Sequence, residues 1–261
     1  LASVSAPSGV TLTPIYAAGL PSGTAVTGPF SARVSATYDD ELQVVSETVQ
    51  GTAPVTFAYD ADGLVVQAGA ESLTRHPSLG HVSGTALGVL TSAFDVDSFG
   101  QLSRLATSAS GASLYEARHT GHDALGRITA VTETTQGPAT AWAYGYDTAG
   151  RLATVTRDAT VVATYAYDQA GNRTSATQSG TTTTATYDEA DRIIASGTKT
   201  FTHTPAGAIE TVTDTAMGSI TRYRYEAGHL AGVQRPDGRV VDYVLDAFGR
   251  RVAKRVDAAL S

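Results

Sequence analysis

Apolar and polar positions alternate along this chain in short segments, and the alternation is clearest where tyrosines stand two residues apart. Tyr144 and Tyr146 form one such pair, and Tyr165 and Tyr167 form another. A period of two places both rings of a pair on the same face of a β-strand. Leu, Val and Thr follow each pair and suit strands, whereas no window keeps the helical period of 3.6. The pattern therefore predicts many short strands and no helices.

A turn phrase separates these strands and repeats along the chain. The phrase Tyr-Asp-x-x-Gly begins at Tyr146 and returns 21 residues later at Tyr167. Asp favours the first position of a type I turn, because its carboxylate accepts hydrogen bonds from nearby backbone N–H groups. Gly three residues later suits a positive φ, and a type I turn followed by such a residue is a common bulged hairpin connection. The repeating unit is therefore predicted to be strand, Asp-x-x-Gly turn, strand and second turn.

Copies of the phrase recur at a spacing typical of repeat architectures, and we count about ten units. In the copy at Tyr187, Asp191 takes the glycine position, which Asp tolerates, and the copy at Tyr225 is shortened by one residue. The structural positions that we assign to the repeat are Tyr59, Asp60, Gly63, Asp123, Gly126, Arg127, Tyr146, Asp147, Gly150, Arg151, Tyr167, Asp168, Gly171, Tyr187, Asp188, Asp246, Gly249 and Arg250.

The repeat divides the chain into three parts. Residues 1–34 are rich in Pro, Gly and Ser and are expected to form an irregular β leading segment or an N-terminal cap. Residues 35–256 form the array, and near 68–93, where the period breaks, we expect either a loose insertion or two degenerate strands. Residues 257–261 are interpreted as a truncated C-terminal end.

Such an array cannot remain a flat ribbon. Strands lie ~4.8 Å apart, so ten two-stranded units would extend on the order of 100 Å. Right-handed twist makes long sheets coil or curl, and apolar side chains occur on both faces of the predicted strands. We therefore expect an all-β fold in which one long twisted antiparallel strip of hairpins curls into part of a hollow shell.

Composition and charge exclude several classes of function. The formal net charge is −7, from 25 acidic and 18 basic residues, which disfavours nucleic acid as a partner. The chain has no cysteine, which excludes disulfides and thiolate metal sites. No apolar run approaches the ~20 residues of a membrane-spanning helix.

Tyr-Asp-x-x-Gly-Arg-Leu at this spacing resembles the YD repeat of RHS proteins, over roughly residues 35–256. That group includes bacterial polymorphic toxins, the BC components of insecticidal toxin complexes and, more distantly, teneurins. The tail that begins at Arg235 looks more like the bacterial RHS core than like teneurin. The resemblance implies a strip of hairpins wound into a hollow cocoon that encloses a C-terminal toxin or effector until delivery.

The resemblance also implies partners and a location. The partners would be the protein's own C-terminal toxin or effector, other parts of the same shell, and a secretion system or cell surface, with a secreted or surface location. Family shells usually end in a self-cleaving segment of the type Pro-x-x-Gly-Leu, which this sequence lacks. Ten units are also fewer than a complete cocoon needs, so we expect a piece of a longer wall or a small self-standing array.

Residues with possible chemistry have a simpler structural interpretation. The repeated aspartates could suggest carboxylate catalysis, but each opens a turn. His119, His122 and Asp123 could suggest a metal site, yet His122 stands in the tyrosine position of a repeat and metal sites need three or more converging ligands. Asp60 and Asp62 resemble the start of a calcium loop that lacks its later ligands. We predict no metal and no cofactor.

Two side-chain series leave alternatives open. Arg127, Arg151, Arg173 and Arg192 recur in one position and could line a lumen, although ion pairs with the turn aspartate of a neighbouring unit are favoured. The tyrosines could stack on sugars, although cross-strand packing explains them. Trp142 is the only tryptophan of the chain, and the sequence indicates no role for it.

The sequence therefore favours a non-enzymatic shell segment that contains a toxin or effector. The alternative is a cell-surface adhesion module that binds protein or glycan with the same strip, and a hidden hydrolase is least favoured because no nucleophile–base motif is visible.

Overall fold

The computed structural model describes residues 2–260, and these residues form strands and turns without any helix. Short runs of β-branched and aromatic residues between glycine-containing turns account for the strands. The strands are β1 Val4–Ser5, β2 Thr11–Ala17, β3 Leu20–Thr27, β4 Ala32–Tyr38, β5 Val44–Val49, β6 Val55–Tyr59, β7 Val65–Ala68, β8 Glu71–Arg75, β9 Val82–Leu87, β10 Leu90–Val96, β11 Leu102–Ala109, β12 Ala112–His122, β13 Ile128–Thr134, β14 Thr140–Tyr146, β15 Leu152–Arg157, β16 Thr160–Tyr167, β17 Arg173–Gln178, β18 Thr181–Tyr187, β19 Ile193–Ser196, β20 Lys199–His203, β21 Ile209–Asp214, β22 Ser219–Glu226, β23 His229–Gln234, β24 Val240–Leu245, β25 Arg251–Val256 and β26 Ala259–Leu260.

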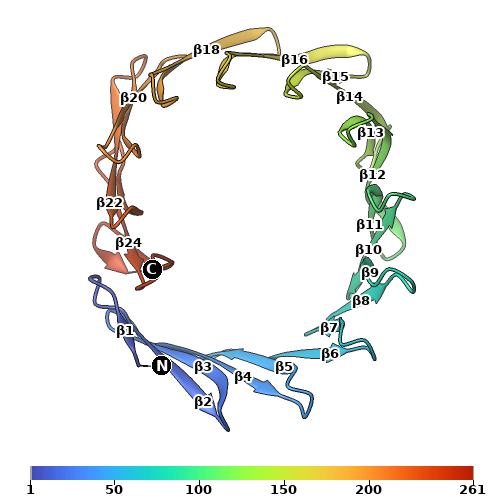
Figure 1. Ribbon diagram of the computed structural model, residues 1–261, viewed down its shortest axis with the longest axis vertical. Helices are drawn as coiled ribbons and strands as arrows, with labels where there is room; N and C mark the ends of the chain where they lie inside the picture. The colour runs from blue at the N-terminus through green and yellow to red at the C-terminus, as the bar shows by residue number, and fades with distance from the viewer. Residues whose placement is uncertain (1, 261) are drawn as a thin grey trace.

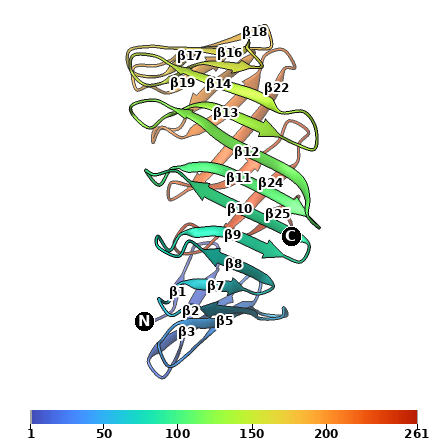
Figure 2. The same ribbon diagram turned by 90° about the vertical axis from the view of Figure 1, so that its right-hand side faces the viewer.

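The strands form one antiparallel meander in which each strand pairs with the next in the sequence. The meander curls into a ring that brings its first and last strands close together (Figure 1). Figure 2 shows the strands stacked along the wall of this ring, tilted across it. The predicted fold class, an all-β strip curled into a shell wall, is confirmed.

The ring has a single layer and an open middle. No segment of residues 2–260 crosses its centre (Figure 1). Twenty-six strands at ~4.8 Å spacing give a circumference of roughly 125 Å and a diameter on the order of 40 Å. A single layer has little interior, so only eight apolar residues of the described chain are buried. The wall must therefore be stabilised largely by its ladders and by contacts between neighbouring units.

The segment near residues 68–93, for which an insertion or two degenerate strands were expected, contains two strands and belongs to the regular meander. It contains β8 and β9, which pair with each other from Glu71↔Leu87 to Arg75↔Val82. The turn between them is His76–His81, in which histidine replaces the expected aspartate. The repeat phrase cannot be recognised in the sequence here, because the turn residues differ although the hairpin is kept.

The two ends of the strip meet through side-chain packing. Val10 and Val244 are almost fully buried and form one cluster with Ala6 and Leu12. Half-buried side chains from both ends, including Phe30 and Val252, pack against this cluster. No ladder pairs β1 with β24, β25 or β26 within residues 2–260. We call this junction the seam.

Candidate functional site: the repeat turns and an aromatic pocket

The Asp-x-x-Gly turn that follows β14 shows how each unit is built. The Gly150 N–H donates to the Asp147 carbonyl at 2.9 Å, and the Asp147 N–H donates to the Arg151 carbonyl at 2.9 Å. Asp147 Oδ1 also accepts the N–H groups of Ala149 at 3.0 Å and Arg151 at 2.9 Å. One carboxylate oxygen therefore holds the whole turn, which explains the aspartate without any catalytic role.

Every complete copy of this turn lies along one edge of the strip, because alternate turns of an antiparallel meander share an edge. The same pair of N–H bonds to one aspartate oxygen recurs at Asp60, Asp123, Asp188 and Asp246. Asp168 accepts the Asn172 N–H in the same manner. Two further copies open with Asp39 and Asp97. The predicted repeat positions are thus brought into a row rather than gathered at one centre.

The turn arginines contact the aspartate of their own turn. Arg151 Nε lies 2.8 Å from Asp147 Oδ2, and the pairs at Asp123, Asp188 and Asp246 have the same spacing of four residues. The expectation that these arginines pair with the aspartate of a neighbouring unit is therefore wrong. In the turn that Asp168 opens, Asn172 stands in the arginine position and donates to the Asp168 carboxylate. Arg173 is the next residue, and its guanidinium carbon lies 5.5 Å from the centre of the Tyr165 ring.

These contacts favour the ionised aspartates. The pKa of Asp188 is lowered to about 2 by the Arg192 guanidinium, and then by backbone N–H groups, against an ordinary value of 3.8. The pKa of Asp147 is also lowered, first by the Arg151 N–H and then by its guanidinium. At Asp246 burial opposes ionisation, but the Arg250 N–H and guanidinium outweigh it, so the pKa is still lowered.

In five of the phrases, the tyrosine connects its unit to the preceding one. The Tyr167 hydroxyl donates to the Leu152 carbonyl at 2.8 Å, and Leu152 begins the strand that follows the previous turn. Tyr38, Tyr59, Tyr146 and Tyr187 make the equivalent bond. The guanidinium carbon of Arg151 also lies 4.6 Å from the centre of the Tyr167 ring. The YD phrase thus builds a turn with its aspartate and joins neighbouring units with its tyrosine.

Other residue types make the same connection where tyrosine is missing, and sequence reasoning missed them. Arg75 donates to the Val65 carbonyl through Nη2 at 2.6 Å, and His119 Nδ1 lies 2.6 Å from the Leu102 carbonyl. Only the shared geometry identifies them, since their side chains do not resemble tyrosine.

The histidine pair that suggested a metal site does not gather a ligand set. The rings of His119 and His122 are 6.3 Å apart in an edge-on arrangement. Within residues 2–260, no group of three or more His, Asp or Glu side chains could hold a metal ion.

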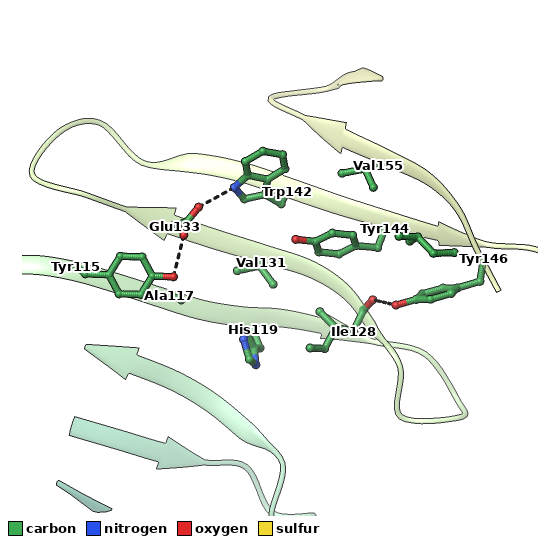
Figure 3. Close-up of a pocket in the computed structure, with 11 residues that line it drawn as sticks. Tyr115, Ala117, His119, Ile128, Val131, Glu133, Trp142, Tyr144, Tyr146 and Val155 are labelled. Carbon is green, nitrogen blue, oxygen red and sulfur yellow. Dashed lines mark hydrogen bonds between the residues drawn. The ribbon is translucent and has the colours of Figure 1, made fainter. Parts of the chain in front are cut away.

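A pocket of about 610 Å³ lies on one face of β12 to β15 (Figure 3). Tyr115, Trp142 and Tyr144 stand around Glu133, and small Ala117 lies opposite Glu133 in the ladder between β12 and β13. Glu133 accepts the Tyr115 hydroxyl at 2.8 Å and the Trp142 Nε1–H at 3.0 Å. Trp142 and Glu133 had no role that could be predicted from the sequence. The pocket combines residues from several strands, and only the register of those strands brings them together.

The seam brings the turn that precedes β2 onto the turn that follows β24. The Ser8 hydroxyl donates to the Leu245 carbonyl at 2.5 Å across a separation of 237 residues. Asp246 has a completely buried side chain, although its partner Arg250 remains exposed. The last aspartate of the array is therefore covered at the seam, unlike the half-exposed aspartates elsewhere.

Comparison with known proteins identifies the architecture. A family model described as Teneurin YD-shell matches residues 22–260. No curated protein matches the sequence. Across the described residues, no helix has the length and apolarity that crossing a membrane would need.

Solved structures of Tc toxins have a similar fold. The chain is similar to a mutant Photorhabdus luminescens Tc holotoxin pore, with a TM-score of 0.57, 14% identity, and coverage of 95% of this chain and 15% of that chain. It is also similar to a TcdB2-TccC3-Cdc42 structure, with a TM-score of 0.58, 12% identity, and coverage of 94% and 17%. The chain therefore spans about a sixth of the length of either structure.

Proposed function

Because the chain belongs to the Teneurin YD-shell family, we propose that it forms part of the wall of a container. This container would enclose a toxin or effector that belongs to the same parent protein. The chain is a segment of RHS shell, as the match to the YD-shell family model indicates, and the Tc toxin structures share its fold. The enclosed molecule would be a polypeptide, which the shell would keep from solvent and proteases until delivery. The parent protein would be located outside the cell or at its surface.

One observation carries this proposal most directly, namely the open middle of a ring whose two ends are joined by a buried seam (Figure 1). A sheet that only presented a binding face would have no need to bring Val10 against Val244. The turn aspartates are occupied with backbone N–H groups, which leaves them no free role as acids or bases. The joined ends therefore favour containment over adhesion, and the occupied aspartates disfavour a hydrolase.

The test is limited proteolysis of the full-length parent protein, including whatever its reading frame encodes after Ser261. We expect the following polypeptide to resist protease in the native protein. In the Val244→Asp variant, which places a charge in the seam, we expect it to be cleaved much faster. Val161→Asp makes the same chemical change at an exposed position on β16 and should leave the protection unchanged.

Three results would overturn the proposal. The first is a reading frame that ends at Ser261, and the second is a following segment that is digested equally fast in all three proteins. The third is a protected segment that stays protected after the seam has been shown to open.

A further inference from the structure

We propose that the pocket on β12 to β15 binds an organic cation of the alkylammonium class, either a free alkylammonium compound or the ammonium group of a lysine side chain. The inference does not depend on the proposed container function. It rests on how aromatic rings and one carboxylate are combined in this pocket.

Aromatic side chains from two strands surround the open space. Tyr115 lies on β12, and Trp142 and Tyr144 lie on β14, with Glu133 of β13 between them (Figure 3). The Tyr144 hydroxyl is directed toward the middle of the pocket (Figure 3). The negative faces of aromatic rings attract cations within ~6 Å, most strongly when several rings share one site. Ala117, which is buried and lies opposite Glu133 in the ladder, has a small side chain that leaves room for a methylated ammonium head.

Glu133 supplies a negative charge that is not neutralised by a cation of the protein. It forms no ion pair within residues 2–260, and both of its oxygens accept hydrogen bonds from neutral donors. These two bonds fix the carboxylate between the Tyr115 and Trp142 rings. Arg157 lies 5.7 Å from the Trp142 ring centre, but its Nε faces the Asp158 carboxylate at 3.8 Å. A half-buried, uncompensated carboxylate among aromatic rings favours a cationic ligand.

The tyrosines around Glu133 respond to its charge. The pKa of Tyr115 is raised, mainly by its hydrogen bond to Glu133 and then by burial. Burial raises the pKa of Tyr144, and the charge of Glu133 raises it further. The negative charge of Glu133 contributes to both shifts, as part of the main cause at Tyr115 and as a smaller cause than burial at Tyr144, and the same charge attracts cations.

Other ligand classes fit the pocket less well. A metal ion would require three or more converging ligands, which the described residues do not gather here. A neutral apolar ligand would remove water from the Glu133 carboxylate without compensating its charge. An alkylammonium ion can contact the aromatic rings and also compensate the negative charge of the Glu133 carboxylate.

Trp142 is the only tryptophan of the chain, so its fluorescence reports on the pocket directly. The protein is titrated with choline, with N-acetyl-lysinamide and with 3,3-dimethylbutan-1-ol, the uncharged carbon analogue of choline. We expect a saturable change in emission with at least one of the two cations and none with the neutral analogue. Tighter binding of choline indicates a free methylated cation, and tighter binding of the lysine derivative indicates a polypeptide side chain.

Variants test whether the named residues are responsible. Glu133→Gln keeps the shape of the side chain and should weaken cation binding at least about tenfold. Tyr144→Leu should weaken binding as well. Glu210→Gln and Tyr223→Leu, on β21 and β22 away from the pocket, are matched controls that should bind as the native chain does.

The proposal fails if neither cation changes the emission saturably up to millimolar concentration. It also fails if the neutral analogue binds equally well, or if Glu133→Gln binds both cations with native affinity while circular dichroism shows a native fold.

Discussion

At the scale of single residues, the wall depends on what one aspartate and one glycine do in each turn. The aspartate accepts two backbone N–H groups through one oxygen and a guanidinium through the other. The glycine adopts the left-handed conformation that completes the turn, with φ +84° at Gly150. The turn is thus specified by residues within four positions of each other, and changes there should have local effects.

The first prediction concerns Gly150→Val. An added Cβ would lie 2.9 Å from Arg127 Nη1, the far end of a side chain, so most of the expected cost comes from the backbone and is about 1–3 kcal/mol of the free energy of unfolding. Hydrogen exchange should accelerate in β13 to β16 and not at distant strands. Gly137→Val is the control, because Gly137 lies outside the left-handed region and an added Cβ would make only an ordinary contact, 3.6 Å from the Thr135 carbonyl oxygen. Equal destabilisation by both substitutions would contradict the prediction.

The second prediction concerns pH. A carboxyl group with a lowered pKa stabilises the folded state above its unfolded pKa, and this stabilisation is lost as the pH falls through the folded pKa. For Asp188, the loss should occur as pH falls from about 4 to about 2, the latter being its folded pKa. Thermal midpoints measured across that range should fall less steeply for Asp188→Asn than for the native chain. The neighbouring Glu189→Gln should keep the native slope, and an unchanged slope in Asp188→Asn would refute the assignment.

At the scale of elements, the unit of construction is the contact between successive hairpins. Ladder hydrogen bonds join the strands, and a tyrosine such as Tyr167 adds a bond to a carbonyl that lies just beyond the end of the ladder. The arginine of one turn then lies against the tyrosine of the next. This explains why Arg75 and His119 can replace tyrosine, since a donor that reaches the carbonyl is sufficient.

The third prediction follows from this contact. Tyr167→Phe keeps the ring beside Arg151 but removes the bond to the Leu152 carbonyl, so the free energy of unfolding should fall by about 1 kcal/mol. Amide exchange should become faster in β15 and β16. Tyr223→Phe serves as the comparison, because its hydroxyl makes no hydrogen bond within the described residues. The inter-unit role would be disproved if both substitutions had the same effect.

At the scale of the whole molecule, the seam decides whether the strip is a closed ring or an open ribbon. Four of the eight buried apolar residues of the described chain form its cluster. The Ser8 bond to Leu245 adds one polar contact between the two ends. The closed shape therefore rests on a small area compared with the ladders that build the wall, and a single charge there should open it.

The fourth prediction measures this opening. The chain has no cysteine, so spin labels can be attached to cysteines introduced at Ser3 and Ala258, which are exposed near the two ends. We expect a short, narrow distance distribution in the otherwise native ring. Val244→Asp should make it longer and broader, because a buried unpaired charge is costly, whereas Val161→Asp should not. A distribution unaffected by Val244→Asp would mean that the packing at Val244 does not close the ring.

The sequence by itself determined the hairpins, the edge on which the aspartate turns lie and the all-β strip, because these depend on residues only a few positions apart. It left the hairpin at His76 undecided, because a different side chain builds the turn, and it assigned the turn arginines to the wrong aspartates. Only the tertiary structure decided that the strip closes, since Val10 and Val244 meet through curvature accumulated over every intervening strand pair. The same holds for the pocket around Glu133, whose rings come together through the register of β12, β13 and β14, which no local pattern encodes.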